Sequence, residues 1–90
     1  MLKIVMSNRF QKDLRLAKKR NLDLTLLQDV VEKLADGEKL DPSYCDHPLL
    51  GEYNNFRECH IKPDWLLIYH IDNDELELFL LRTGSHSDLF

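Results

Sequence analysis

Residues 56–82 read FRECHIKPDWLLIYHIDNDELELFLLR, and this stretch decides the fold. Apolar and aromatic runs bounded by turn residues are typical of strands. Three strands are predicted here, at residues 56–62, 65–71 and 76–82. Pro63 ends the first, since proline cannot donate to a strand ladder, and Asp72-Asn73-Asp74 supplies the second turn. Because short turns join antiparallel strands, the stretch predicts a mainly antiparallel sheet with the nearly all-apolar middle strand at its centre.

Two helices are predicted ahead of this sheet. In residues 8–20 the apolar side chains recur at helical spacing, and Ser7 or Asn8 can cap the first turn with a side-chain oxygen. Asp23 caps a second helix with the same periodicity, and Gly37 ends it because glycine tolerates the left-handed cap conformation. Only a few residues separate the two helices, so they are expected to form an antiparallel hairpin.

The remaining segments complete the layout. Residues 2–5 read as a short first strand. Residues 38–55 lack sustained periodicity and are predicted to be a loop, and residues 84–90 are predicted to be a mobile tail. The order β-α-α-β-β-β indicates an α+β fold, in which the helical hairpin packs on one face of a small, mainly antiparallel sheet and leaves the other face free.

Length and composition bound the class of protein. With 90 residues, of which 43% are hydrophobic and 31% charged, the chain is expected to form a single domain over residues 1–90. A domain of this size has little material with which to enclose a deep pocket, so a large substrate on an open groove is favoured. No apolar run approaches the roughly 20 residues of a membrane span, and no signal-peptide core is seen. Two cysteines without a paired spacing complete the expectation of a cytoplasmic protein with no membrane contact.

Charge is distributed unevenly along the chain. The net charge is −4, but residues 1–40 carry nine Lys and Arg against six Asp and Glu, whereas residues 41–90 carry three against ten. Six cations gather on the first predicted helix, and we call them the basic arc: Arg9, Lys12, Arg15, Lys18, Lys19 and Arg20. Such an arc is either a solvated face or a phosphate-binding surface, because phosphate contacts need little beyond positive charge. In the second case Lys12, Arg15 and Lys19 are the candidate contacts.

The groups suited to chemistry lie in the second half. The chain has no Gly-rich phosphate loop, no zinc-type cysteine pairing and no Gly-x-Ser-x-Gly elbow. It offers instead five side chains at strand ends and in loops, where scaffolds present reactive groups: His47, His60, Asp64, Arg82 and His86. A lone histidine is usually a plain surface residue, but an imidazole that titrates near pH ~6.5 is also suited to moving protons. His60 shares a face with Glu58 and not with Cys59, which is expected in the core.

Three further side chains allow two interpretations each. Arg82 either forms a structural ion pair or presents its fork of donors to a phosphate. Trp65 is either a core residue or a stacking platform for a base, and its buried strand favours the core. Phe90 ends a polar tail in which periodicity gives it no packing role, so stacking on a nucleobase is favoured.

Two blocks of the sequence resemble a known family. The first has DHPL at 46–49, Gly51 and FRECHIKPDWLLIY at 56–69, and the second is RTGSHSDLF at 82–90. Together they are similar to the YafQ branch of the RelE/ParE toxin superfamily. The resemblance implies a RelE-like fold and the toxin of a type II toxin–antitoxin system that cuts messenger RNA in the ribosomal A site.

The resemblance also implies roles for the candidate residues. His47, His60, Asp64 and His86 match acid–base positions, Arg82 matches a phosphate-stabilising arginine, and Trp65 and Phe90 match residues implicated in activity or substrate contact. His86 is the candidate general acid. Metal-independent RNA cleavage needs a base for the 2′-hydroxyl, a cation for the phosphorane-like charge and an acid for the departing 5′-oxygen. These side chains supply all three, so neither a metal nor a cofactor is expected.

Partners and alternatives follow from the same resemblance. The expected partners are a cognate antitoxin, whose acidic and partly disordered tail would bind the basic arc, and the ribosome with its rRNA and mRNA. Operator DNA would be reached only indirectly, through the antitoxin complex. Three alternatives stay open: a ParE-like inhibitor of DNA gyrase on the same fold, a metal-dependent nuclease with His47, His60 and Asp64 as ligands, and a non-catalytic RNA-binding module that uses the basic arc.

Overall fold

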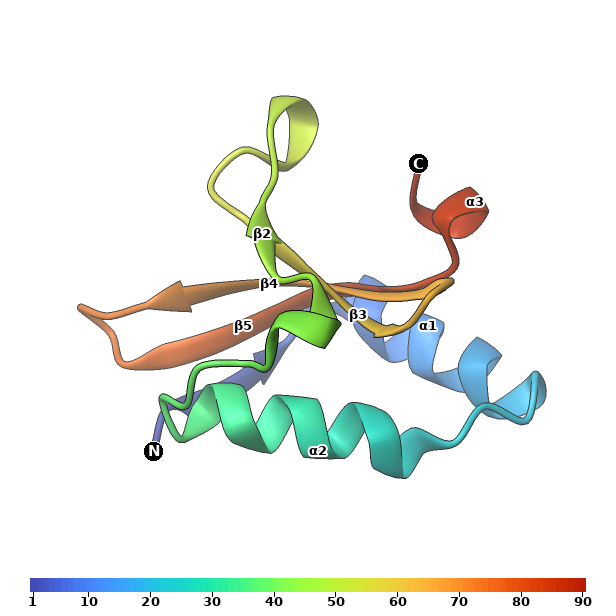
Figure 1. Ribbon diagram of the computed structural model, residues 1–90, viewed down its shortest axis with the longest axis horizontal. Coiled ribbons are helices and arrows are strands. Elements are labelled where there is room, and N and C mark those ends of the chain that lie inside the picture. The colour runs from blue at the N-terminus through green and yellow to red at the C-terminus, as the bar shows by residue number, and fades with distance from the viewer.

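A five-stranded sheet in the order β1-β5-β4-β3-β2 runs through the computed structural model, which describes all 90 residues (Figure 1). Only β1 and β5 pair in parallel, and the other neighbours are antiparallel. The strands are β1 Lys3–Met6, β2 His47–Pro48, β3 Arg57–Lys62, β4 Trp65–Asp72 and β5 Glu77–Gly84. The helices are α1 Asn8–Lys19, α2 Leu24–Ala35 and α3 His86–Leu89, with 3-10 turns η1 Pro42–Tyr44 and η2 Gly51–Tyr53. The predicted α+β fold and its three-strand antiparallel unit are confirmed.

The two long helices begin at the predicted residues and end within two residues of the predicted positions. The Ser7 hydroxyl accepts the Phe10 amide at 2.9 Å and donates to the Leu81 carbonyl at 2.7 Å, so the cap of α1 also ties the helix to β5. Asp23 caps α2 by accepting the Thr25 amide at 3.1 Å. Gly37 follows the end of α2 with φ +77°, a conformation that glycine adopts without steric cost.

The main core lies between α1, α2 and the sheet. Both helices cover the same face, which is the lower one in Figure 1. Alternation along β4 turns Trp65, Leu67 and Tyr69 towards the helices, where they pack with Phe10 and the apolar faces of α1 and α2. Cys59 is fully buried in this cluster, as predicted, and burial raises the pKa of its thiol to about 12.

The opposite face of the sheet is not free, and the sequence-based prediction was wrong on this point. There β4 presents Leu66 and Ile68, which pack with Leu89 and are flanked by Leu49 and Tyr53. Figure 1 shows β2, η2 and α3 on this side, above the sheet. Because β4 is apolar on both faces, its second face also has to be covered, and two short segments without periodicity cover it.

Those two segments are themselves corrections. Residues 38–55, predicted to be a loop, contain β2, which pairs with β3 and sets His47 opposite Glu58. Residues 84–90, predicted to be a mobile tail, form the helical turn α3, held by a reciprocal capping box between Ser85 and Asp88. Both segments are too short for a periodic pattern to appear in the sequence. None of the helices has the length and apolarity that a membrane crossing requires.

Candidate active site

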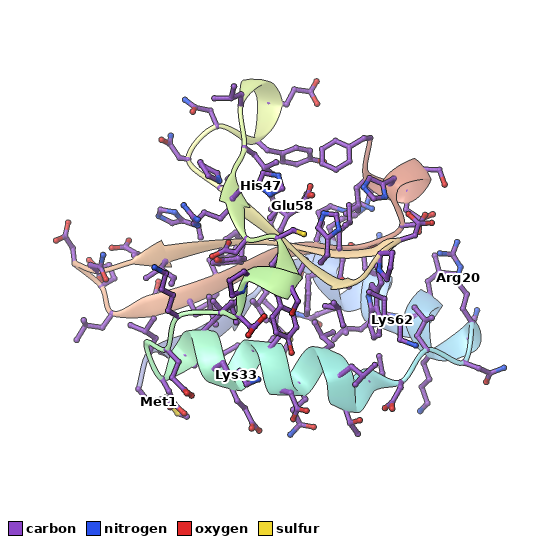
Figure 2. All side chains as sticks on the ribbon, in the orientation of Figure 1. Met1, Arg20, Lys33, His47, Glu58 and Lys62 are labelled. Carbon is purple, nitrogen blue, oxygen red and sulfur yellow. The ribbon has the colours of Figure 1, made fainter.

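Three histidines from three separate elements meet on the second face of the sheet. The β2–β3 pairing sets His47 opposite Glu58, and alternation along β3 puts His60 on the same side as Glu58. Figure 2 shows His47 and Glu58 close together above the sheet. The third histidine, His86, comes from α3, and its ring centroid lies 5.6 Å from that of His60.

Glu58 is the carboxylate at the centre of this group. It is only 5% exposed, and its Oε1 accepts a hydrogen bond from His60 Nε2 at 3.1 Å. His47 Nε2 lies 3.7 Å from the same oxygen. A buried carboxylate is costly unless it is paired, so the hydrogen bond from His60 explains why it is tolerated. Sequence reasoning did not select Glu58 as a site residue; its only signal was the alternation that placed it on the face of His60.

His47 is oriented by its own loop. Its Nδ1 lies 2.6 Å from the Cys45 carbonyl oxygen. Since a carbonyl can only accept, Nδ1 carries the proton and Nε2 is the nitrogen turned towards Glu58. Asp46 anchors this loop to the sheet by accepting the Tyr69 hydroxyl at 2.6 Å and Arg57 Nε at 3.2 Å. Burial, and then the Asp46 carboxylate, raises the pKa of the Tyr69 hydroxyl above its usual range, so it remains a donor.

His86 is held by Asp64, which lies in the turn between β3 and β4. One oxygen of Asp64 accepts both the His86 backbone amide at 2.9 Å and the His86 Nδ1 at 2.7 Å. These two bonds, the backbone one first, lower the pKa of the Asp64 carboxyl. With Nδ1–H directed to Asp64, the His86 Nε2 is left for a substrate. This is the geometry of a carboxylate that orients an imidazole for proton transfer.

Arg82 is bound to a residue of α1. Its Nε and Nη2 donate to the two oxygens of Asp13 at 3.0 and 3.2 Å, and the Thr83 amide donates to the same carboxylate at 3.1 Å. Asp13 is only 9% exposed, although it belongs to the basic first helix. The hydrogen bonds that Arg82 donates to Asp13 raise the pKa of its guanidinium. The ion-pair interpretation of Arg82 is therefore confirmed, and contact with a phosphate stays a prediction for its remaining donors.

The aromatic candidates occupy very different environments. Trp65 is 3% exposed, and its Nε1 donates to the Thr83 hydroxyl at 3.0 Å, so the structure favours the core interpretation and leaves no open ring face for a base. Phe90 is 63% exposed and packs edge-to-face on Tyr53, with ring centroids 5.6 Å apart. The Tyr53 hydroxyl donates to the Leu89 carbonyl at 3.3 Å. Tyr53, which sequence reasoning did not select, therefore supports the exposed ring of Phe90.

The basic arc is not part of this cluster. Lys12, Arg15 and Lys19 are exposed on α1, in the layer on the other side of the sheet. One member of the arc is already paired, because Arg20 forms a 2.7 Å ion pair with Asp88 of α3. The structure thus brings together His47, His60, Asp64 and His86 but leaves the predicted phosphate-binding cations of α1 as a separate surface.

The cluster could also hold a metal ion. One ligand atom each from Glu58, His60 and His86 lie within 4.8 Å of one another. Imidazole nitrogens and a carboxylate oxygen suit zinc and copper among the divalent ions. The same three side chains are equally suited to acid–base chemistry.

Known proteins share both the sequence and the fold. A family model described as "Bacterial toxin of type II toxin-antitoxin system, YafQ" matches residues 2–90. The mRNA interferase toxin YafQ of Escherichia coli K12 is 40% identical over 85 residues, which cover 93% of this chain and 90% of that protein. A metal-bound toxin from Helicobacter pylori is 53% identical, with full coverage of both chains and a TM-score of 0.94. YafQ in the E. coli DinJ–YafQ complex is 36% identical over 100% of this chain and 99% of that one, with a TM-score of 0.91.

Proposed function

This chain belongs to the YafQ family of toxins from bacterial type II toxin–antitoxin systems, and on that premise we propose that it is an endoribonuclease that cleaves messenger RNA by acid–base catalysis. One observation carries the proposal: a buried carboxylate between two imidazoles faces a third imidazole that a second carboxylate orients. Groups for accepting and for donating a proton thus stand within one site.

The reaction is an internal displacement at phosphorus. The base group, formed by Glu58 with His47 and His60, takes the proton of the 2′-hydroxyl, and O2′ forms a bond to the phosphorus. The bond from phosphorus to O5′ breaks, and protonated His86 Nε2 gives its proton to the departing oxygen. The products are a 2′,3′-cyclic phosphate and a 5′-hydroxyl end. Each proton transfer contributes about 10²–10⁴-fold in rate.

Asp64 and Arg82 assist without moving a proton. Asp64 keeps its proton off down to unusually low pH, since its pKa is lowered, and in this state it accepts the His86 Nδ1–H and fixes the direction of the ring. Arg82 is held by Asp13 through Nε and Nη2, and its Nη1, in a guanidinium that lies beside the Tyr53 hydroxyl, would donate to a phosphate oxygen. A fixed cation at this position stabilises the charge that develops on the phosphate in the transition state.

We further propose that cleavage depends on the ribosome, and the openness of the site supports this. The side chains of His47 and His86 are about half exposed, so the protein does not enclose its substrate. A ribosome that holds the message in the A site would supply the attacking geometry that the toxin lacks, and exposed cations of α1 would contact rRNA phosphates. We therefore expect the reaction to take place in the cytoplasm. Phe90 would stack on a base next to the cleaved bond.

An antitoxin is the second partner of the proposal. The E. coli relative is described in a complex with DinJ, an antitoxin. We expect a cognate antitoxin with an acidic tail to bind the basic arc, because complementary charge steers and strengthens such contacts. Operator DNA would be bound only through that complex.

The test is cleavage of a message on programmed ribosomes by purified toxin that has been treated with EDTA and then freed of it, so that the ribosomes keep their Mg²⁺. We expect new 5′ ends at one position in A-site codons, with 2′,3′-cyclic phosphate on the upstream fragment. Loss of cleavage by the EDTA-treated toxin, restored by added zinc, would establish the metal-dependent alternative. Intact messages with damaged DNA in induced cells would establish the gyrase alternative, and ribosome binding that survives alanine at every histidine, without cleavage by the parent protein, would establish the binding module.

A metal ion is a second candidate ligand, favoured by the donor set of Glu58, His60 and His86 and by the metal-bound relative from H. pylori. A bound zinc or copper ion would supply a Lewis acid. It would also occupy imidazole nitrogens that the acid–base reaction needs free. We therefore expect added zinc or copper to slow the cleavage and EDTA to restore it.

A further inference from the structure

The turn that carries His86 cannot position itself. α3 has only four residues, His86–Leu89, and so short a helix is not stable without contacts to the rest of the protein. Three side chains from distant parts of the chain form hydrogen bonds with it. Tyr53 and Asp64 are already described, and the third is Arg20, the residue that ends α1.

We propose that Arg20 is a positioning residue for His86, acting through Asp88. The inference rests on the proposed function, since it concerns the general acid of that reaction. It gives Arg20, one cation of the basic arc, a role other than phosphate binding. Figure 2 shows Arg20 beyond the end of α1, on the side of the molecule where α3 lies.

The contact between the two residues is bidentate. Arg20 Nη1 donates to Asp88 Oδ2 at 2.7 Å and Nη2 donates to Oδ1 at 3.3 Å, across 68 residues of sequence. Parallel donors on one carboxylate fix direction as well as distance. The pKa of the Asp88 carboxyl lies well below its usual range, because of Arg20 first and the Ser85 amide second. The pair therefore stays charged throughout the range in which imidazoles titrate.

Asp88 passes this constraint on to the start of the turn. Its Oδ2 also accepts the Ser85 amide at 2.9 Å, and its own amide donates to the Ser85 hydroxyl at 3.2 Å. Ser85 directly precedes His86, so the oxygen held by Arg20 also fixes the backbone entering His86. Gly84 makes the approach possible, since a Cβ there would lie 2.9 Å from Asp88 Oδ2.

Loss of Arg20 should therefore loosen the direction of the His86 ring without removing any catalytic group. Arg20 is 45% exposed, and pairs of this kind contribute modestly, so we expect Arg20→Gln to lower kcat about two- to fivefold. The change in KM should be no larger than that caused by Arg9→Gln. This variant removes an equal charge from the first turn of α1, and Arg9 forms no ion pair. Arg20→Lys keeps one charged donor and should give an intermediate kcat.

The test compares an ordinary message with one whose scissile 5′-oxygen is sulfur, because sulfur departs without being protonated. Single-turnover rates are measured at saturating ribosomes for the parent, Arg20→Gln, Asp88→Asn, the double variant and Arg9→Gln. If Arg20 acts through Asp88 on the general acid, the Arg20→Gln defect vanishes on the sulfur substrate. The double variant should then be no slower than the worse single variant.

Other outcomes overturn the inference in recognisable ways. If the loss of kcat in Arg20→Gln persists on the sulfur substrate, or if it equals the loss in Arg9→Gln, then Arg20 acts only as one of the cations of the arc. An unchanged kcat shows that Asp64 alone positions His86. Absence of cleavage by the parent protein on the ordinary message contradicts the proposed function instead, so the two failures are distinguishable.

Discussion

The two faces of the sheet are built from alternate residues of the same strands, yet they differ in what holds them together. The face under α1 and α2 has a core of 13 buried residues, whereas the face under β2 and α3 has only three: Leu66, Ile68 and Leu89. Glu58 and the three histidines lie on the rest of the second face. A large core on one side stabilises the strands, so the other side can hold polar groups that contribute little to folding.

The largest expected effect is on the second face. His86→Ala should lower cleavage about 10²–10⁴-fold, because the departing oxygen loses its acid. On the sulfur-substituted message most of this loss should disappear. Glu58→Gln, on the base side, should show no comparable rescue, and the same applies to His60→Ala.

The stability of these variants should be measured alongside their cleavage rates, so that a loss of activity is separated from a loss of folding. The urea midpoint of His86→Ala should stay close to that of the parent, since the imidazole is half exposed and contacts mainly Asp64. An undiminished defect on the sulfur substrate would mean that His86 positions the phosphate or serves as the base.

The second-largest effect is expected on the helix-covered face, where a variant should lose stability and keep its activity. Phe10 is fully buried in the main core, so Phe10→Ala should lower the free energy of unfolding by about 3–5 kcal/mol. Urea unfolding followed by circular dichroism measures this change. At low temperature, the folded fraction of Phe10→Ala should cleave at the parent rate. The control is Leu16→Ala, which shortens an exposed apolar side chain of α1. A specific loss of activity in folded Phe10→Ala would show that the two faces are not separable.

Asp13 is where the two faces are joined, and its variant should affect both properties moderately. Asp13→Asn keeps the shape but removes the charge that three donors from Arg82 and Thr83 share. We expect a loss of about 1–3 kcal/mol in the free energy of unfolding, the cost of leaving donors poorly paired. The cleavage rate should fall as well, because Arg82 loses its fixed direction. A large loss of stability with an unchanged kcat would make Asp13 purely structural.

The same contrast explains what could be predicted from sequence. Helix caps such as Ser7 and Asp23, and the periodicity of α1 and α2, are local signals, and they predicted the helix-covered face. The second face depends on β2, with two residues, and α3, with four, which are too short for any period to show.

The contacts of the site are harder still to predict, because they join distant parts of the chain. Asp13 and Arg82 are 69 residues apart, and on sequence alone Asp13 is one acid among the cations of a helix surface. Glu58 had a local signal, its alternation with Cys59, but burial between two imidazoles appears only when β2 pairs with β3. The resemblance to a family selected the histidines and Asp64, whereas Glu58 and Asp13, which hold His60 and Arg82, required the fold.

The smallest expected effect belongs to the basic arc, which lies outside both cores. If Lys12, Arg15 and Lys19 contact rRNA phosphates, changing all three to Gln should weaken ribosome binding roughly tenfold and reduce the slope of log affinity against log salt by about two to three. The cleavage position and the rate at saturating ribosomes should not change, since these three residues lie on α1, across the sheet from α3, and Arg20 is kept. A triple variant of Lys3, Lys33 and Lys39, exposed outside the arc, removes the same charge and is the matched control. If both triple variants flatten the salt dependence equally, ribosome attraction follows net charge alone. If the affinity of the arc variant is unchanged, the arc is a solvated surface, and the site on the second face must engage the ribosome without it.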